Sequence, residues 1–185
     1  MYDVIIAGQG VAGSLLAWEC IKHQFKVLLF DPGHSLNASL AAGAIINPVT
    51  GKNLQKSWMV DELIPAAIKT YREIEERLQQ RFITDLKIYH IFKNTKEIND
   101  WSVKRYEEAY QKYLINPNIF FIKNDEVINP LGAFEIKGGL KVNAYMLLTA
   151  LREWFKNQNI LIEEYLNEDQ ICEKSDYVQY KEYKA

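Results

Sequence analysis

The stretch VIIAGQGVAGSLLAWE, residues 4–19, carries the pattern that decides the fold of this chain. A short apolar run over residues 2–7, rich in β-branched side chains, is typical of a strand buried on both faces in a parallel sheet. Glycines then break the run, and over residues 11–23 apolar side chains recur at helical spacing. The pattern therefore predicts a strand, a glycine turn and a helix in direct succession.

A second buried strand is predicted over residues 26–30, KVLLF. It ends at Asp31, just before the strand breakers Pro32 and Gly33. Strand, helix and strand at this spacing make a βαβ crossover, which joins parallel neighbours of one sheet.

The glycine turn, GQGVAG at residues 8–13, has the spacing of a dinucleotide-binding motif. The first glycine permits a tight turn, the second lets the backbone approach a pyrophosphate, and the third lets the helix pack close to the strand. The N–H groups and the positive dipole end of the helix would hold the phosphates. An acidic side chain about twenty residues further on would bind a ribose hydroxyl.

Asp31 lies near that offset, and an acid at this position argues against the 2′-phosphate of NADP. The alternative interpretation of the turn is a glycine-rich connection that binds no ligand. The predicted cofactor-binding residues of this region are Gly8, Gly10, Val11, Ala12, Gly13, Asp31 and Pro32.

The composition is ordinary for a globular protein, with 185 residues, 48% hydrophobic content and a formal net charge of −2. This charge balance gives no electrostatic basis for binding nucleic acid or an anionic membrane surface. The two cysteines, Cys20 and Cys172, have no metal-ligand spacing, so we expect no metal and a reducing compartment. The N-terminal apolar run has no basic region before it and is interrupted by glycines. We therefore expect no signal peptide, no membrane span and a cytoplasmic protein.

The order of the remaining elements indicates a sheet domain that is interrupted by an insertion. Helices are expected over residues 60–82, 99–114 and 143–157, and strands over residues 86–92, 119–122, 133–136 and 159–165. The last stretch, residues 172–185, is polar and tyrosine-rich with only weak alternation. We assign residues 1–58 and 143–185 to a partial dinucleotide-binding domain, and residues 59–142 to a partial inserted substrate lobe.

Residues 35–51, SLNASLAAGAIINPVTG, are mostly small and suit close approach of the backbone to a ligand. A nicotinamide dehydrogenase would normally continue here through further βα units. Together with the glycine turn, LLFD at residues 28–31 and GGLKVNAYMLLTALREWFKNQNILIEE at residues 138–164, this loop resembles the FAD-dependent oxidoreductases of the D-amino-acid oxidase superfamily. That group includes glycine and sarcosine oxidases and the oxidase domain of the bifunctional tRNA-modifying enzyme MnmC.

The resemblance implies an α/β fold: a Rossmann-like FAD-binding parallel sheet of the GR2 type, interrupted by an inserted α+β substrate lobe. It implies FAD as the cofactor, with the pyrophosphate at the three glycines of the turn and the adenosine ribose at Asp31. Ribityl or flavin contacts are implied near Ser39, Ala42, Gly43 and Ala44. The implied activity is oxidation of a C–N bond in a small amine or amino acid by hydride transfer to the flavin, with much of the chemistry belonging to the cofactor.

Two departures from the family pattern bear on function. Family members more often have glutamate at the position of Asp31, so the ribose contact is expected to be longer or bridged by water. Beyond residue 165 the family continues with a β-meander, an apolar strand, the rest of the substrate lobe and a further glycine-rich FAD contact, and the sequence shows none of these. The first strand is then expected to have an open edge, which favours self-association or indicates a truncated chain.

No catalytic residue is assigned from the sequence. The arginines that a substrate carboxylate would need all lie on predicted helices: Arg72, Arg77, Arg81, Arg105 and Arg152. His90 is interpreted as a structural histidine, because nothing at catalytic spacing pairs with it. Two alternatives to an FAD-dependent oxidase stay open: an inactive or truncated nucleotide-binding fragment, and an NAD-dependent dehydrogenase.

Overall fold

The computed structural model describes residues 1–33, 38–114 and 118–185, and these divide into two compact units. The first unit comprises Met1–Ala44, Glu75–Phe82 and Asn143–Ala185, and the second comprises Ile45–Ile74 and Ile83–Val142. Residues 45–58 thus lie in the second unit and residues 75–82 in the first, which differs from the boundaries expected above. The assignment of cofactor binding to one unit and substrate binding to the other stays a prediction.

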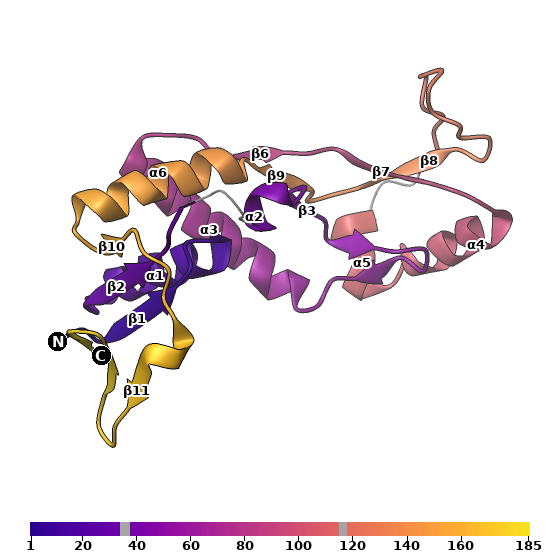
Figure 1. Ribbon diagram of the computed structural model, residues 1–185. Helices are drawn as coiled ribbons and strands as arrows, with labels where there is room; N and C mark the ends of the chain where they lie inside the picture. Colours follow the sequence, from indigo (N-terminus) through magenta and orange to yellow (C-terminus); the bar gives the residue numbers. More distant parts are fainter. Residues whose placement is uncertain (34–37, 115–117) are drawn as a thin grey trace. The chain divides into compact units, whose positions relative to one another are not determined.

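The first unit is built on a parallel sheet with strand order β1-β2-β10 (Figure 1). The strands are β1 (Val4–Ala7), β2 (Val27–Phe30) and β10 (Leu161–Ile162). Helix α1 (Val11–Lys22) joins β1 to β2, which is the predicted βαβ crossover. The third strand comes from the far end of the chain and pairs with β2 at Leu29 and Phe30. The predicted parallel α/β sheet is therefore confirmed, with β2 at its centre.

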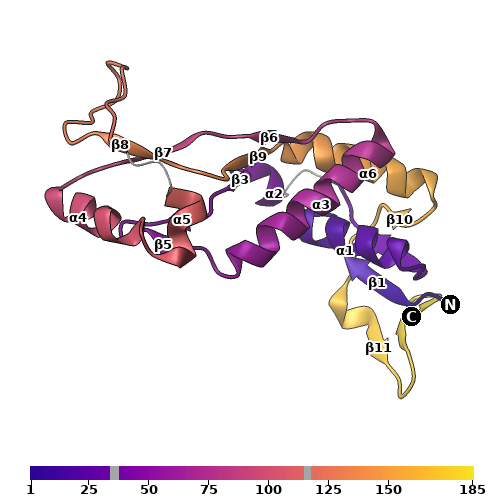
Figure 2. The ribbon, with the colours of Figure 1, turned by 180° about the vertical axis from the view of Figure 1, so that it is seen from behind.

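One face of this sheet is covered by an antiparallel meander at the end of the chain. Its strands are β11 (Ile171–Glu173), β12 (Val178–Tyr180) and β13 (Tyr183–Lys184). Tyr180 and Tyr183 pack edge-on against Phe30, with ring centroids 5.2 and 5.6 Å apart. The expectation that the meander is missing was wrong: these strands are anchored by their tyrosines, which weak alternation does not reveal. Both ends of the chain meet here, where the Tyr2 N–H donates to the Lys184 carbonyl at 2.7 Å (Figure 2).

Strand alternation directs Val27 and Leu29 to the other face of the sheet, where both are buried. Helix α1 contacts β1 and β2, helix α6 (Ala144–Asn157) contacts β10, and the two helices contact each other. Trp18 of α1 and Trp154 of α6 lie 5.2 Å apart between ring centroids. The apolar stripe of α6 supplies the buried residues Leu147, Leu148, Leu151 and Phe155. The two helices thus form one apolar layer against this face of the sheet.

The second unit contains three small antiparallel groups of strands. They are β3 (Ile45–Ile46) with β9 (Leu140–Val142) and β6 (Ile83–Asp85); β4 (Val49–Thr50) with β5 (Gln55–Lys56); and β7 (Ile88–Ile91) with β8 (Ala133–Ile136). Its helices are α4 (Thr95–Lys104), α5 (Glu108–Leu114) and most of α3 (Val60–Leu78). The core that these elements share combines aliphatic side chains with four aromatic ones, Phe92, Trp101, Tyr113 and Phe134.

Three expected elements differ from those observed in this region. The single helix expected over residues 99–114 is two helices, because the chain turns between Lys104 and Glu108. The strand expected over residues 119–122 is reduced to one bridge between Phe120 and Ala133. Helix α3 ends at Leu78, where Gln79 takes a left-handed backbone with φ +53°. Among the described residues, no helix has the length and apolar character needed to cross a membrane.

Gly13 provides a test of how closely α1 packs on β1. A Cβ added there would lie 1.9 Å from the Gly8 carbonyl oxygen, a backbone atom that cannot move freely. We expect Gly13→Ala to lower the free energy of unfolding by about 1–3 kcal/mol, the usual cost of overpacking. Urea denaturation measures this change.

The matched control is Gly43→Ala, since a Cβ at Gly43 meets no atom within 4 Å. Its stability is expected to equal that of the unsubstituted chain, or to rise slightly as the unfolded state loses freedom. Equal stabilities of the two variants would contradict the close packing at Gly13.

Candidate functional site

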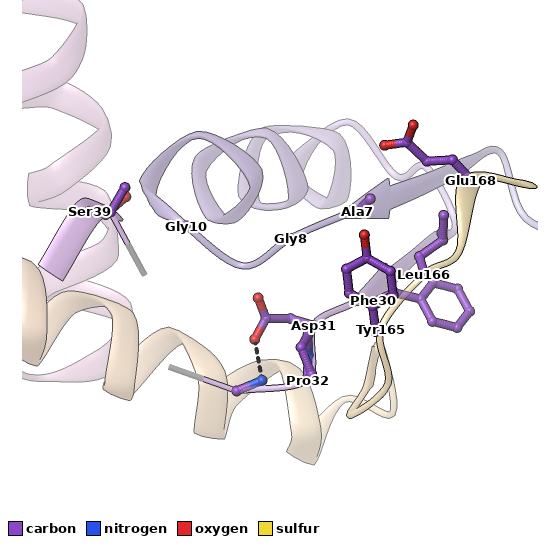
Figure 3. A pocket seen from close by; sticks show the side chains of 12 residues that line it. Ala7, Gly8, Gly10, Phe30, Asp31, Pro32, Ser39, Tyr165, Leu166 and Glu168 are labelled. Atoms are coloured by element: carbon purple, nitrogen blue, oxygen red, sulfur yellow. Dashed lines mark hydrogen bonds between the residues drawn. The ribbon is translucent and has the colours of Figure 1, made fainter. Parts of the chain in front are cut away.

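The first unit holds a cavity of about 550 Å³ at the carboxyl ends of β1 and β2 (Figure 3). In open parallel sheets, ligands bind outside the carboxyl ends of the strands. The chain segment after β10 lines a further side of the cavity. The lining residues are Ala7, Gly8, Gly10, Phe30, Asp31, Pro32, Gly33, Ala38, Ser39, Tyr165, Leu166 and Glu168.

The glycine turn forms one wall of this cavity. Gly8 has φ +90°, a backbone that side chains rarely adopt, and its N–H donates to the Phe30 carbonyl at 2.7 Å. Gly10 caps helix α1 without any side-chain hydrogen bond, and the first turn of α1 contains no acidic residue. The N–H groups of that turn have no acceptor within the helix, and the dipole there favours negative charge. The turn is therefore suited to bind an anion such as a phosphate.

The loop of small residues that follows β2 also lines the cavity, through Ser39. Ser39, on α2 (Ala38–Ala41), accepts a hydrogen bond from the Val11 N–H at 3.1 Å and so ties the loop to the start of α1. Ala42 and Gly43 are exposed, and Ala44 has a left-handed backbone with φ +49°. None of these three is among the residues that line the cavity. Residues 35–37 of the predicted loop lie outside the described residues.

Asp31 is held by donors from three directions. Its Oδ2 accepts the Gln9 N–H at 2.8 Å, and its Oδ1 accepts the Gly33 N–H at 2.8 Å. Oδ1 also accepts a hydrogen bond from Nη1 of Arg152 at 2.8 Å, which makes an ion pair. The side chains of Arg152 and Asp31 are only 8% and 10% exposed. The carboxylate predicted to bind ribose is thus part of a buried charge pair.

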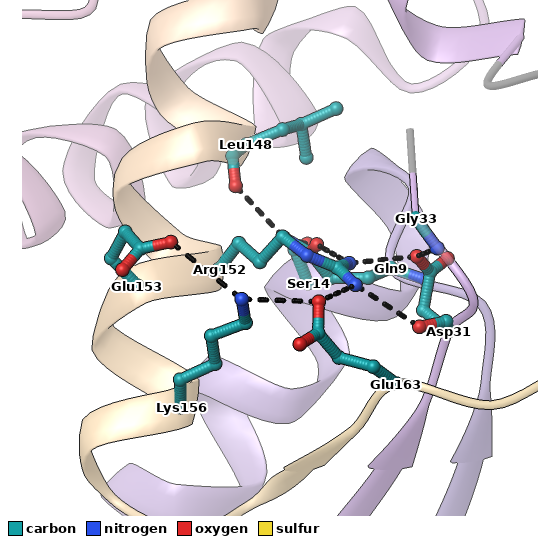
Figure 4. A network of polar contacts seen from close by, with 9 residues as sticks. All are labelled: Gln9, Ser14, Asp31, Gly33, Leu148, Arg152, Glu153, Lys156 and Glu163. Carbon is teal, nitrogen blue, oxygen red and sulfur yellow. Dashed lines mark hydrogen bonds and ion pairs between the residues drawn. The ribbon is translucent and has the colours of Figure 1, made fainter. Parts of the chain in front are cut away.

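A wider polar network surrounds this pair (Figure 4). Gln9 is fully buried; its amide nitrogen donates to the Leu148 carbonyl at 2.9 Å and lies 3.4 Å from the Ser14 hydroxyl. Its amide oxygen accepts a hydrogen bond from Arg152 at 2.9 Å. Arg152 also donates to the Asp31 backbone carbonyl at 3.1 Å and to Glu163 at 2.9 Å. The network joins the glycine turn, the end of β2, helix α6 and the segment after β10.

Arg152 is the residue of this site that sequence reasoning missed. Its partners Gln9 and Asp31 lie 143 and 121 residues away, so no local pattern connects Arg152 with them. The feature of the sequence that could have indicated a buried polar partner is Gln9, a long polar side chain in a turn that packs against the sheet. Arg152 and Lys156 together hold the pKa of Glu163 below its ordinary value. The terminal nitrogens of Arg152 make four hydrogen bonds to described residues, which leaves them unsuited to bind a substrate carboxylate.

An apolar wall faces the glycine turn across the cavity. It is formed by Phe30, Tyr165 and Leu166, which Figure 3 shows grouped at one end. Apolar walls with a few polar groups are typical of small-molecule sites. The cavity therefore combines an anion site, the carboxylates of Asp31 and Glu168, and an apolar surface.

The structure brings five of the predicted residues to this cavity: Gly8, Gly10, Asp31, Pro32 and Ser39. Val11, Ala12 and Gly13 form the first turn of α1 next to it. The cofactor contacts of all these residues, and of Ala42, Gly43 and Ala44, stay predictions.

His90 lies in the second unit and is packed rather than free. Its Nε2 is 3.3 Å from Glu97 Oε2, and its ring lies 5.2 Å from that of Phe134. The Lys93 N–H, and secondarily His90, lower the pKa of Glu97. These contacts support a structural role for His90.

The buried pair can be tested by a double-mutant cycle. Removing one partner leaves an uncompensated buried charge, so Asp31→Leu and Arg152→Met are each expected to lower the free energy of unfolding by about 3 kcal/mol or more. The double variant should lose less free energy of unfolding than the two single variants lose in sum, by at least about 1 kcal/mol, because the two sites interact. Urea unfolding of the four proteins measures the coupling.

Lys156→Met is the control, because Lys156 is a half-buried cation one turn further along α6. It is expected to change stability by less than about 1 kcal/mol. Strict additivity of the Asp31 and Arg152 losses would show that the pair is not coupled.

Comparisons with known proteins agree with this geometry. Residues 3–172 match the family model DAO, FAD dependent oxidoreductase. Glycine oxidase from Geobacillus kaustophilus superposes with a TM-score of 0.69 at 20% identity, over 96% of this chain and 50% of that one. Glycine oxidase from Bacillus cereus ATCC 14579 gives a TM-score of 0.63 at 22% identity, over 96% and 51%. For L-amino acid deaminase from Proteus myxofaciens the TM-score is 0.66 at 16% identity, over 96% and 41%.

These identities are low, so the structural likeness establishes the fold, and the chain spans about half the length of the structures it matches. The family match is independent of that likeness and extends from the first strand of the sheet to the start of the meander. On this evidence, the chain belongs to the DAO family of FAD dependent oxidoreductases.

Proposed function

We propose that this chain binds FAD in the cavity of its first unit and serves the oxidation of a C–N bond in an amine or amino acid. The observation that carries the proposal is the meeting of the glycine turn, Asp31 and an apolar wall around one cavity of about 550 Å³. A volume of this size is in the usual range for cofactor sites. Family membership supports FAD over other dinucleotides.

The residues present fit the adenosine half of FAD. The pyrophosphate would lie at the N-terminus of α1 beside Gly8 and Gly10, where N–H groups lack helical acceptors. The adenosine ribose would meet Asp31, and the adenine ring would lie against Phe30 and Tyr165. The ribityl chain and flavin would extend toward Ser39 and the loop that carries Ala42, Gly43 and Ala44.

The chemistry that FAD supplies when bound is acceptance of a hydride, here from the carbon that bears the nitrogen. The residues that line the cavity would bind and orient the adenosine half, and none of them is assigned a catalytic role. Glycine oxidase and L-amino acid deaminase, named among the similar structures, support a small amino acid or amine as substrate. Because the chain covers about half of those proteins, the activity of the whole protein is part of the proposal.

The open edge of β1 bears on partners. Among the described strands, β1 pairs with β2 alone, so its outer edge offers unpaired backbone groups. We propose that this edge pairs with a further strand, from a second copy or from other polypeptide.

The cysteines Cys20 and Cys172 are free, which supports a reducing compartment such as the cytoplasm.

Titration of the purified chain with FAD tests cofactor binding. Bound FAD is expected to turn the protein yellow and to survive gel filtration. Gly10→Val should weaken FAD binding at least about ten-fold, because a side chain would occupy the space that the pyrophosphate needs. Gly10 has an extended backbone with φ −72° and ψ −177°, which valine adopts readily, so this variant should keep its fold.

Ala109→Val, an exposed position on α5 of the second unit, is the control and should bind FAD as the unsubstituted chain does. Binding of NAD with no retention of FAD would support the dehydrogenase alternative, and binding of neither would support the inactive fragment.

Anaerobic mixing of the FAD-loaded chain with small amino acids and amines tests the reaction itself. Loss of flavin absorbance on mixing is expected for a substrate and does not depend on the electron acceptor. Retention of FAD without any bleaching would separate cofactor binding from catalysis and contradict the second part of the proposal.

A further inference from the structure

Arg152 is a buried cation that the proposed chemistry does not use. It approaches Asp31 from helix α6 and, within the described chain, does not line the cavity. Its guanidinium contacts three separate segments through Gln9, Asp31 and Glu163 (Figure 4). A planar guanidinium presents its donors in a fixed fork, so these contacts define one orientation of the groups they reach.

The hydrogen bonds of Asp31 show which acceptor positions of its carboxylate are still available in that orientation. A carboxylate has about four acceptor positions, two on each oxygen. Among the described residues, Oδ1 receives the Gly33 N–H and Arg152, whereas Oδ2 receives only the Gln9 N–H. With respect to the described residues, one acceptor position therefore remains on Oδ2, the oxygen on the side of the glycine turn (Figure 3).

Arg152 determines which oxygen of Asp31 keeps an open acceptor position among the described contacts. It binds Oδ1 at 2.8 Å and the Asp31 backbone carbonyl at 3.1 Å, and so fixes both the side chain and the strand end that carries it. It also donates to the side-chain amide oxygen of Gln9, and the backbone N–H of Gln9 donates to Oδ2 of Asp31. Both ends of the carboxylate are thus positioned by one guanidinium, directly on one side and through Gln9 on the other.

Resting on the FAD binding proposed above, we propose that Arg152 is a positioning residue for the adenosine of the cofactor. It holds the Asp31 carboxylate so that Oδ2 accepts a hydrogen bond from a ribose hydroxyl. Arg152 itself touches neither ribose nor phosphate. Selectivity for a hydroxylated ribose is then a joint property of Asp31 and Arg152.

The test compares two ligands, ADP and 2′,3′-dideoxy-ADP, by isothermal titration calorimetry on the full chain. The unsubstituted chain should bind ADP at least about ten-fold more tightly, the size expected of one hydrogen bond to a charged group. Arg152→Lys keeps the charge near Asp31 but lacks the fork, so it should reduce this ratio several-fold. Arg152→Met, where it folds, should bring the ratio close to one.

Lys156→Met is the matched control, since it removes a cation from the same helix that contacts Glu163 but not Asp31. It should leave the ratio unchanged. A general loss of stability would weaken both ligands equally, so the ratio separates positioning from a merely structural role. Circular dichroism and thermal unfolding verify the fold of each variant.

The outcomes distinguish this inference from the proposed function. Failure of the unsubstituted chain to bind ADP or FAD would refute the proposed function. Binding of ADP and its dideoxy analogue with equal affinity would leave cofactor binding intact and overturn the role of Asp31 and Arg152. A ratio that is high in the unsubstituted chain and unchanged in Arg152→Lys would overturn the role of Arg152 alone.

Discussion

The first unit depends on the burial of one positive charge. The side chain of Arg152 is only 8% exposed, and a cation so far from water is tolerated only with paired charge and hydrogen-bonded partners. Those partners lie on the turn after β1, at the end of β2 and after β10, so the three segments must meet at one point. This requirement seats α6 against the glycine turn and sets the orientation of Asp31. The candidate cofactor site is a consequence of that arrangement.

Local pattern was sufficient to predict the central part of the fold. The run of β-branched residues, the three glycines and the strand ending at Asp31 are contiguous signals, and β1, α1 and β2 appear where they were expected. The return of the chain to this domain after the insertion was also expected, from the order of the elements, and β10 pairs with β2. Of the candidate site, Gly8, Gly10, Asp31, Pro32 and Ser39 do share one cavity.

The remaining features depend on contacts that a single sequence does not display. Tyr180 and Tyr183 hold the meander against Phe30. These two tyrosines lie about 150 positions after Phe30 in the chain. The pairing of Asp31 with Arg152 spans 121 residues. The sequence placed Arg152 on a predicted helix, where a charged residue is usually solvated, and gave no sign of a buried partner. Long-range packing therefore overrode the local expectation at both places.

The neighbouring ends of the chain have a consequence for the outer edge of β1, which no other described strand occupies. Tyr2 precedes β1 and is hydrogen bonded to Lys184, so any polypeptide joined to Ala185 would start beside that edge. A strand tethered there would meet β1 at high effective concentration and would not bear the entropy loss of bimolecular association. The same strand supplied by a separate molecule would bear that loss in full. Covalent attachment at this end would thus favour closure of the sheet within one molecule over pairing between molecules.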